Sequence, residues 1–186
     1  MALIIVAVII IVLAVFMIGI FNGMVTKRNQ VDEANSQIQV QLERRHDLIP
    51  NLVNSAKGFM DFEKGVLLQV TQARANAINA QAQGPAAQGA AENVLTGALK
   101  SLFAVVENYP QLKSDQTVIS LMEELKTTEN QISFSRQHYN ATVLTYNNAL
   151  QTFPNVIFAG MFNFTKREFF AAETGAEAVP VVNLGS

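Results

Sequence analysis

Residues Gln41 to Asn54 read QLERRHDLIPNLVN, and the predicted fold depends on them because Pro50 falls within an otherwise continuous helical pattern. A proline inside a helix removes one backbone donor, and its ring crowds the carbonyl four residues earlier. Two interpretations remain open: a chain turn with Asp47 capping a new helix, or one helix that continues through a kink. We favour the kink, since Leu42 and Ile49 keep one heptad phase across the proline.

An amphipathic pattern extends in both directions from this stretch. Between Val31 and Ala77, apolar residues recur at spacings of three, four or seven, with charged and amide residues on the opposite side. This periodicity predicts a helix that packs one face against partner helices. We expect the first bundle helix to cover residues 27–82.

The segment before it is apolar throughout. Ala2 to Phe21 contains nothing more polar than Gly19, and at ~1.5 Å per residue its length matches the ~30 Å hydrocarbon layer of a bilayer. A cleaved signal peptide would need basic residues before a shorter apolar core. We therefore predict an uncleaved, single-pass anchor over residues 1–26. Lys27 and Arg28 follow it, so the positive-inside rule places the N-terminus outside and the remainder in the cytoplasm.

Helical periodicity and breaking residues divide the rest of the chain. Residues 91–109 and 115–151 are predicted helices, the second capped by Ser114 or Asp115, and residues 156–171 are expected to contain a short last helix. Residues 75–91 indicate an exposed connection, and residues 172–186 an extended tail. The fold class is all-α: a transmembrane helix that continues into an antiparallel up-and-down bundle over residues 27–170, with a long, Pro50-kinked first helix.

The residues that usually carry chemistry are few. The 186-residue chain has a formal net charge of −2, two histidines and no cysteine, which argues against nucleic-acid binding and against a nucleophile and base pair. Glu43 and His46 have the Glu-x-x-His spacing of di-metal carboxylate sites in helical bundles. The other histidine, His138, has Ser135 three places before it, so the second such motif is missing. We predict no catalytic residues, no metal, no cofactor and no small-molecule substrate.

Three features are candidate interaction sites. Arg44 and Arg45 are expected either to pair with acids of a neighbouring helix, such as Glu123, Glu124 or Glu129, or to bind an acidic partner. The aromatic run Val156–Phe164 caps the bundle in one interpretation. In the other it meets lipid or a partner, with contributions from Phe158, Phe162, Lys166 and Arg167. Gly19 and Gly23 form a GxxxG pair suited to helix pairing in the membrane.

Several blocks together resemble the LemA family: RRHDLIPNLV, TENQISFSRQHYN, QTFP and GMFNFTKREFF. The resemblance covers residues 27–170. It implies a bacterial inner-membrane protein with one N-terminal transmembrane helix, a short outer N-terminus and a cytoplasmic antiparallel helical bundle. Asn35 stands where family members often have tryptophan, and Asn163 where glycine is usual. The family has no established molecular function, so no catalytic residue is transferred.

The function expected from these features is a non-enzymatic scaffold. The apolar segment Ala2–Phe21 would hold the bundle on the lipid bilayer, where the bundle would assemble with itself or with other membrane proteins. A membrane-shaping or lipid-binding module is the alternative, and a metal-dependent enzyme based on Glu43 and His46 is a remote one.

Overall fold

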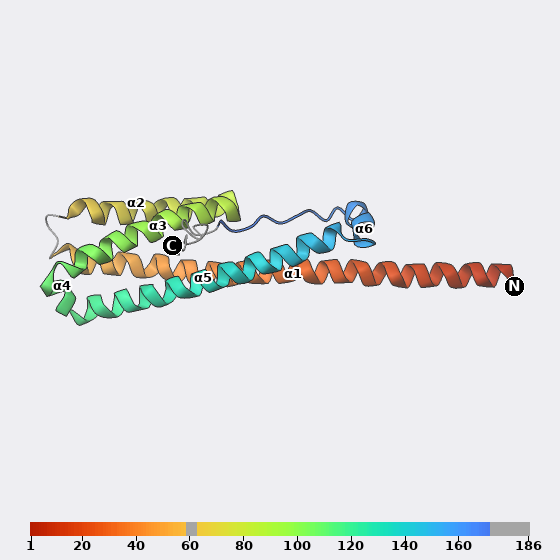
Figure 1. Ribbon diagram of the computed structural model, residues 1–186, viewed down its shortest axis with the longest axis horizontal. Helices are drawn as coiled ribbons and strands as arrows, with labels where there is room; N and C mark the ends of the chain where they lie inside the picture. Colours follow the sequence, from red (N-terminus) through yellow and green to blue (C-terminus); the bar gives the residue numbers. More distant parts are fainter. Residues whose placement is uncertain (59–62, 172–186) are drawn as a thin grey trace, which may run out of the picture. The chain divides into compact units, whose positions relative to one another are not determined.

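The computed structural model describes residues 1–58 and 63–171 of the chain (Figure 1). Every regular element in these ranges is helical, which confirms the predicted all-α class. The elements are α1 (Ala2–Lys57), α2 (Lys64–Ala80), the 3-10 helix η1 (Gln81–Gln83), α3 (Pro85–Glu107), α4 (Pro110–Ser114), α5 (Gln116–Gln151) and α6 (Asn155–Met161).

Helix α1 continues through Pro50, so the turn interpretation is wrong and the continuity of the helix is confirmed, whereas the kink at Pro50 stays a prediction. Pro50 has no N–H to donate to the carbonyl of His46, its helical partner. The Nε of Arg74, on α2, donates to that carbonyl at 2.7 Å instead. A side chain from the neighbouring helix thus supplies the missing donor, which explains how the helix tolerates the proline.

The helix predicted over residues 27–82 is two helices. Helix α1 ends at Lys57, before Gly58, and α2 begins at Lys64. Glycine lowers helical propensity because its backbone loses more conformational entropy, so Gly58 marks a favourable place to end α1. Apolar residues recur at the same spacing before and after Gly58, so the sequence pattern did not reveal the break between α1 and α2.

The connection expected over residues 75–91 is also much shorter in the structure. Helix α2 continues to Ala80, and α3 begins at Pro85 after Gly84, which has φ 97°. Glycine adopts this conformation without strain, and proline suits the first turn of a helix. The predicted start of α5 is confirmed: the Oδ1 of Asp115 accepts hydrogen bonds from the backbone N–H groups of Thr117 at 2.8 Å and Val118 at 3.1 Å.

The chain forms two compact units, whose limits differ from the expected division at residue 26. Among the described residues, the anchor unit comprises Met1–Val40 with Ile132–Glu168, and the bundle unit comprises the described part of Gln41–Gln131 with residues 169–171. In the bundle unit, α2 and α3 lie side by side (Figure 1). One apolar core joins them to the end of α1, to α4 and to the start of α5, and its members include Leu52, Val70, Leu102, Leu112 and Val118.

In the anchor unit, the first part of α1 is apolar and exposed. Its most hydrophobic window has a mean hydropathy of 3.5, and none of that window is buried. By length and composition, α1 is a helix that can cross a membrane. The following part of α1 buries an apolar stripe, as does the second half of α5; the buried residues are Met24, Val31, Ala34 and Ile38 on α1, and Ile132, Tyr139, Val143, Tyr146 and Leu150 on α5.

The predicted last helix is shorter than expected. Helix α6 ends at Met161, and residues 164–171 are not helical, which corrects the helix predicted over 156–171. Asn163 lies just after α6 with φ 55°. Asparagine tolerates this left-handed conformation better than most residues other than glycine, which explains how it can occupy a position where the family resemblance leads us to expect glycine.

Candidate functional site

The most polar part of the bundle unit is a buried cluster around Arg45. Arg45 and Glu92 have fully buried side chains and form an ion pair, and Arg45 also pairs with Glu129, whose side chain is 27% exposed. Thr96 accepts a hydrogen bond from Nη1 of Arg45 at 3.0 Å and donates one to Oε1 of Glu129 at 2.7 Å. Helices α1, α3 and α5 are therefore linked by one ionic layer inside the bundle.

His46 extends this cluster on the other side of Glu92. Its Nε2 lies 2.9 Å from Oε1 of Glu92. Burial alone raises the pKa of the Glu92 carboxyl, but the hydrogen bond with His46 and the charge of Arg45 outweigh burial, so the pKa of Glu92 lies below its ordinary value. Glu92 is thus held ionised where an unpaired carboxylate would be very unfavourable.

This arrangement suits a structural role better than a reaction centre. Glu43, the carboxylate of the Glu-x-x-His pattern, is exposed, whereas His46 is directed at Glu92. Within residues 1–58 and 63–171, no group of three or more His, Cys, Asp or Glu side chains is placed to hold a metal ion. Glu129 and Thr96 line an open groove of about 340 Å³ together with Lys100, Phe103 and Lys126.

The two adjacent arginines have different environments. Arg44 is half exposed and lies 3.7 Å from Glu124, which is equally exposed. Arg45 is buried and committed to Glu92 and Glu129. The expected pairing with acids of a neighbouring helix is therefore what the structure shows for both residues, and Arg45 offers no surface to an outside partner.

Sequence reasoning missed Glu92 and Thr96, although one signal was present. Arg45 belongs to the heptad series Val31, Ile38, Arg45 and Leu52, whose other members are buried. Glu92 likewise precedes Leu99 and Val106 at intervals of seven. A charged residue in a buried heptad position predicts an oppositely charged partner in the same layer.

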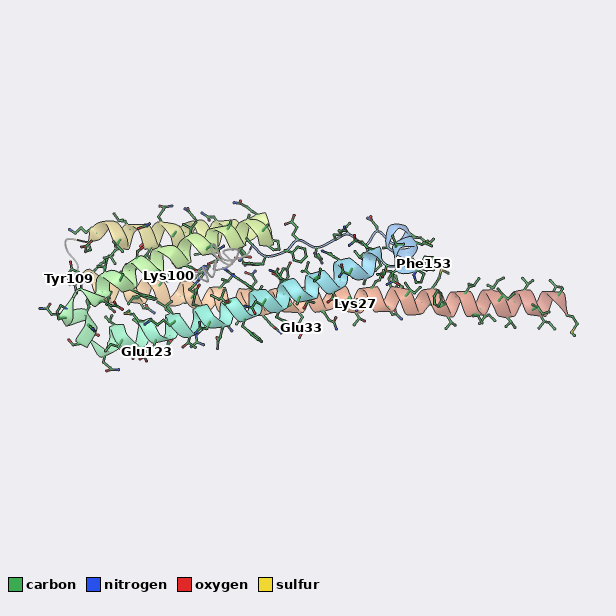
Figure 2. All side chains as sticks on the ribbon, viewed as in Figure 1. Lys27, Glu33, Lys100, Tyr109, Glu123 and Phe153 are labelled. Atoms are coloured by element: carbon green, nitrogen blue, oxygen red, sulfur yellow. The ribbon has the colours of Figure 1, made fainter. Side chains whose placement is uncertain are left out.

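The aromatic run of the anchor unit exposes much of its apolar surface. Around α6, Phe153 is 81% exposed, Met161 66% and Ile157 55%. Of the candidate residues, Phe162 is 44% exposed and Phe158 is half-buried. Phe153 lies beside α6 at the end of α5 (Figure 2).

The segment after α6 contacts α1 through aromatic rings. Phe162 and Phe164 both meet Phe21 edge-on, with ring centroids 5.0 and 5.7 Å away. The guanidinium of Arg28 lies over the ring of Phe164, 5.6 Å from its centroid. Such ring pairs add about 0.5–1.5 kcal/mol beyond the area that they bury. The aromatic run is thus attached to α1 where the apolar segment ends.

Residues 164–168, here called the strap, are held by side chains of α5. Tyr146 donates to the carbonyl of Thr165 at 3.1 Å, and Tyr139 donates to that of Glu168 at 2.9 Å. Asn147 donates to the carbonyl of Arg167 and accepts from its N–H, both at 2.9 Å. Burial raises the pKa of both tyrosines, which keeps the donating hydroxyls protonated.

The two cations that follow α6 have partners within the anchor unit. Lys166 donates to Oε1 of Gln151 at 3.2 Å. Arg167 pairs with Asp32 at 2.9 Å, and both side chains are substantially exposed. These contacts hold the strap to α5 and α1.

Gly19 and Gly23 lie in an open groove along α1. The groove has a volume of about 510 Å³ and is also lined by Val15, Lys27 and Asn155. A Cβ atom built on either glycine would meet nothing within 4 Å. The glycine pair therefore faces open space in the single chain, and its role in helix pairing stays a prediction.

An exposed apolar N-terminal helix that continues into a helical bundle defines the class of this protein. Comparison with known sequences identifies the family within that class. The LemA family model matches residues 34–184, and the chain belongs to the LemA family.

Curated relatives agree with this assignment. The magnetosome protein MamQ of Magnetospirillum gryphiswaldense is 26% identical over 87% of this chain and 68% of its own length. Magnetosome protein MamQ 2 of Paramagnetospirillum magneticum is 25% identical over the same shares. Protein LemA of Metamycoplasma hominis is 26% identical over 73% of this chain and 62% of its own length.

Proposed function

We propose that this protein is a non-enzymatic, membrane-anchored scaffold. In this proposal, α1 holds the helical bundle at the cytoplasmic face of the bacterial inner membrane, where the protein assembles with itself or with other membrane proteins. The observation that carries the proposal is the continuity of α1, because one uninterrupted helix supplies both the exposed apolar segment and a buried stripe of the bundle core.

The buried cluster supports a structural rather than a catalytic role. Arg45 and Glu92 pair with each other and with Glu129, His46 and Thr96, and their side chains are fully buried inside the bundle rather than in an open cleft. Buried ionic groups of this kind commonly fix the register and partners of packed helices. A scaffold needs such a defined register to present a constant surface.

The orientation follows from charge. Lys27 and Arg28 lie directly after the apolar segment, and the positive-inside rule places them in the cytoplasm. A reporter that is active only outside the cytoplasm, fused after Ser186, should be inactive. Reporter activity would overturn the cytoplasmic placement of the bundle.

Self-assembly is tested by the mass of the full-length protein in mild detergent. We expect a species larger than the monomer, or a co-purifying membrane protein. If Gly19 and Gly23 mediate pairing, Gly19→Ile with Gly23→Ile should reduce the mass of the complex. Ala14→Ile is the matched control, because Ala14 lies on the opposite face of α1. A strictly monomeric protein without partners would count decisively against the scaffold.

A lipid-binding or membrane-shaping module is a second candidate, and the exposed apolar side chains of α6 favour it. Reconstitution of the full-length chain into vesicles tests this function through vesicle shape. We expect narrow or tubular vesicles with the native chain and larger, round vesicles with Ile157→Asp and Met161→Asp combined. Equal shapes for both proteins would remove this candidate.

A further inference from the structure

We infer that α6 is a membrane-interface helix, which lies in the headgroup layer of the leaflet where α1 leaves the bilayer and faces anionic phospholipids. This inference rests on the proposed anchoring of α1. It specifies the depth of α6, the side chains that enter the lipid and the cations that face the headgroups.

The apolar side chains of α6 need a non-aqueous environment. Helix α6 has only seven residues, and two of them, Ile157 and Met161, are more than half exposed, as is Phe153 just before the helix. Patches of large exposed apolar side chains mark interaction sites in most proteins. Amphipathic and aromatic elements at a membrane surface bury such side chains at the boundary between headgroups and acyl chains.

The contacts with α1 set the depth of this surface. The apolar run that starts at Ala2 spans about 30 Å by Phe21, at about 1.5 Å per residue, so Phe21 marks the edge of the hydrocarbon layer. Phe162 and Phe164 pack on Phe21. At the other end of α6, Asn155 lines the same groove as Lys27 of α1. Both ends of α6 are therefore next to the stretch of α1 that leaves the hydrocarbon layer.

The position of α6 at the edge of the hydrocarbon layer favours lipid over a soluble protein as the molecule that covers its exposed apolar side chains. Water-soluble partners do not reach the hydrocarbon edge, whereas acyl chains and headgroups surround any surface at that level. Phe162, directly after α6, packs on Phe21 at the end of the exposed apolar segment of α1. One bilayer can cover both surfaces.

The charges near α6 fit anionic headgroups. Residues 153–164 contain no charged side chain, and α1 has Lys27 and Arg28 but no acid between Phe21 and Asp32. Juxtamembrane cations attract anionic lipid, by about 1 kcal/mol each. Arg167 is paired with the carboxylate of Asp32, whereas the partners of Lys166 and Arg28 are a neutral amide and an aromatic ring. Lys27, Arg28 and Lys166 therefore keep a net positive charge for the headgroups, and Lys27 and Arg28 are the two on α1.

The lack of cysteine makes this depth measurable in the full-length chain, because each introduced cysteine carries the only label. Spin labels would be placed at Ile157→Cys and Met161→Cys in protein reconstituted into phosphatidylcholine and phosphatidylglycerol vesicles. Val12→Cys is the reference within the apolar segment, and Leu68→Cys, an exposed apolar site on α2, is the aqueous control. The measurement is collision with oxygen, which partitions into lipid, against collision with a water-soluble nickel complex.

We expect the oxygen-to-nickel ratio at Ile157 and Met161 to be several-fold higher than at Leu68 and lower than at Val12. A ratio at both α6 sites equal to that at Leu68 would overturn the inference, and so would low collision with both reagents, which indicates cover by protein. If Val12 is also aqueous, the anchoring itself is wrong. If Val12 is lipid-exposed and α6 aqueous, only this inference fails.

Whether α6 faces anionic headgroups is tested by changing the charge of the lipid or of the protein. Replacing phosphatidylglycerol by phosphatidylcholine should lower the ratio at Met161, as should Lys27→Gln with Arg28→Gln. The matched control is Lys100→Gln with Lys126→Gln, which removes the same charge from the bundle unit and should leave the ratio unchanged. If the oxygen-to-nickel ratio at Met161 changes neither with lipid charge nor with either pair of substitutions, α6 does not face anionic headgroups.

Discussion

The bundle unit and the anchor unit bury polar groups in different ways. In the bundle unit, Arg45 and Glu92 bring full charges into the core and neutralise them there. In the anchor unit, Tyr146 and Asn147 direct neutral polar groups at the main chain of the strap. Both arrangements give buried polar groups a partner of opposite character, but removing one partner has a different consequence in each unit.

A buried charge that loses its partner keeps its full desolvation penalty, whereas a neutral hydrogen bond contributes only about 0.5–1.5 kcal/mol net. The two units should therefore differ in how strongly single substitutions lower the free energy of unfolding. We expect the ionic layer to be far less tolerant than the strap, although both are made of polar residues.

Arg45→Ala should have the largest effect. It leaves Glu92 buried with His46 as its remaining partner, so the free energy of unfolding should fall by about 3–5 kcal/mol. Urea unfolding in detergent, followed by circular dichroism, measures this change. Arg44→Ala is the matched control and should cost at most about 1 kcal/mol, because its pair with Glu124 is half exposed. Equal effects of the two variants would contradict the proposed importance of the buried layer.

Arg74→Met should come next. It removes the donor that replaces the missing N–H of Pro50, and a hydrogen bond from a charged group contributes about 1.5–3 kcal/mol. Pro50→Ala restores the helical donor to the His46 carbonyl, so Arg74→Met should cost clearly less in that background. A double-mutant cycle from urea unfolding measures this coupling. Additive effects would show that Arg74 does not compensate for the proline.

Acid should weaken the bundle unit through Glu92. The folded-state pKa of Glu92 lies below the unfolded value, so its contribution to stability is present above the unfolded pKa and is lost as the pH falls through the folded pKa. We expect the urea concentration at the midpoint of unfolding to decrease as the pH is lowered below about 4.5. Glu92→Gln should flatten this dependence and Glu124→Gln should not, and equal slopes for these variants would assign the acid sensitivity elsewhere.

Asn147→Leu should act locally on the strap. It removes both hydrogen bonds to the backbone of Arg167, each worth about 1 kcal/mol. Amide hydrogen exchange at Arg167 should accelerate, while exchange in α3 stays unchanged. Gln137→Leu, an exposed change on the same helix, is the control. Unchanged protection at Arg167 would mean that the strap does not depend on Asn147.

The smallest effect is expected at Asn163. Its φ of 55° lies in the left-handed region, so Asn163→Ala should cost about 1 kcal/mol and Asn163→Gly should be close to neutral. Thermal unfolding of both variants checks the order. A neutral alanine would indicate that the turn after α6 relaxes without strain.

Much of the fold could be predicted from the sequence, because helical periodicity reports which face of a helix is buried. The start of α5 after Asp115 was predicted from a capping residue, and the exposed segment of α1 from an uninterrupted apolar run. The break after Lys57 was missed, since one glycine costs a helix only about 1 kcal/mol and the apolar spacing resumed beyond it. The uninterrupted course of α1 past Pro50 depends on Arg74, a contact that no local pattern contains.

The candidate sites were predicted less well, for reasons of geometry. Arg45 and Glu129 were named as partners, but the sequence did not show that Glu92 occupies the same layer. That layer depends on the register of three helices, and heptad spacing alone leaves this register open. The strap was mistaken for a helix because bonds from side chains to the main chain leave no periodic signal.

The way in which the strap is held also bears on how this protein can evolve. Tyr139, Tyr146 and Asn147 bind carbonyl and N–H groups, which every residue except proline possesses. These bonds do not depend on the side chains of Thr165 and Glu168, which can therefore diverge with little selective penalty, whereas Phe164, Lys166 and Arg167 also make side-chain contacts with α1 or α5. A new charge pattern or recognition motif can arise at this surface by single substitutions without rebuilding the helices beneath it.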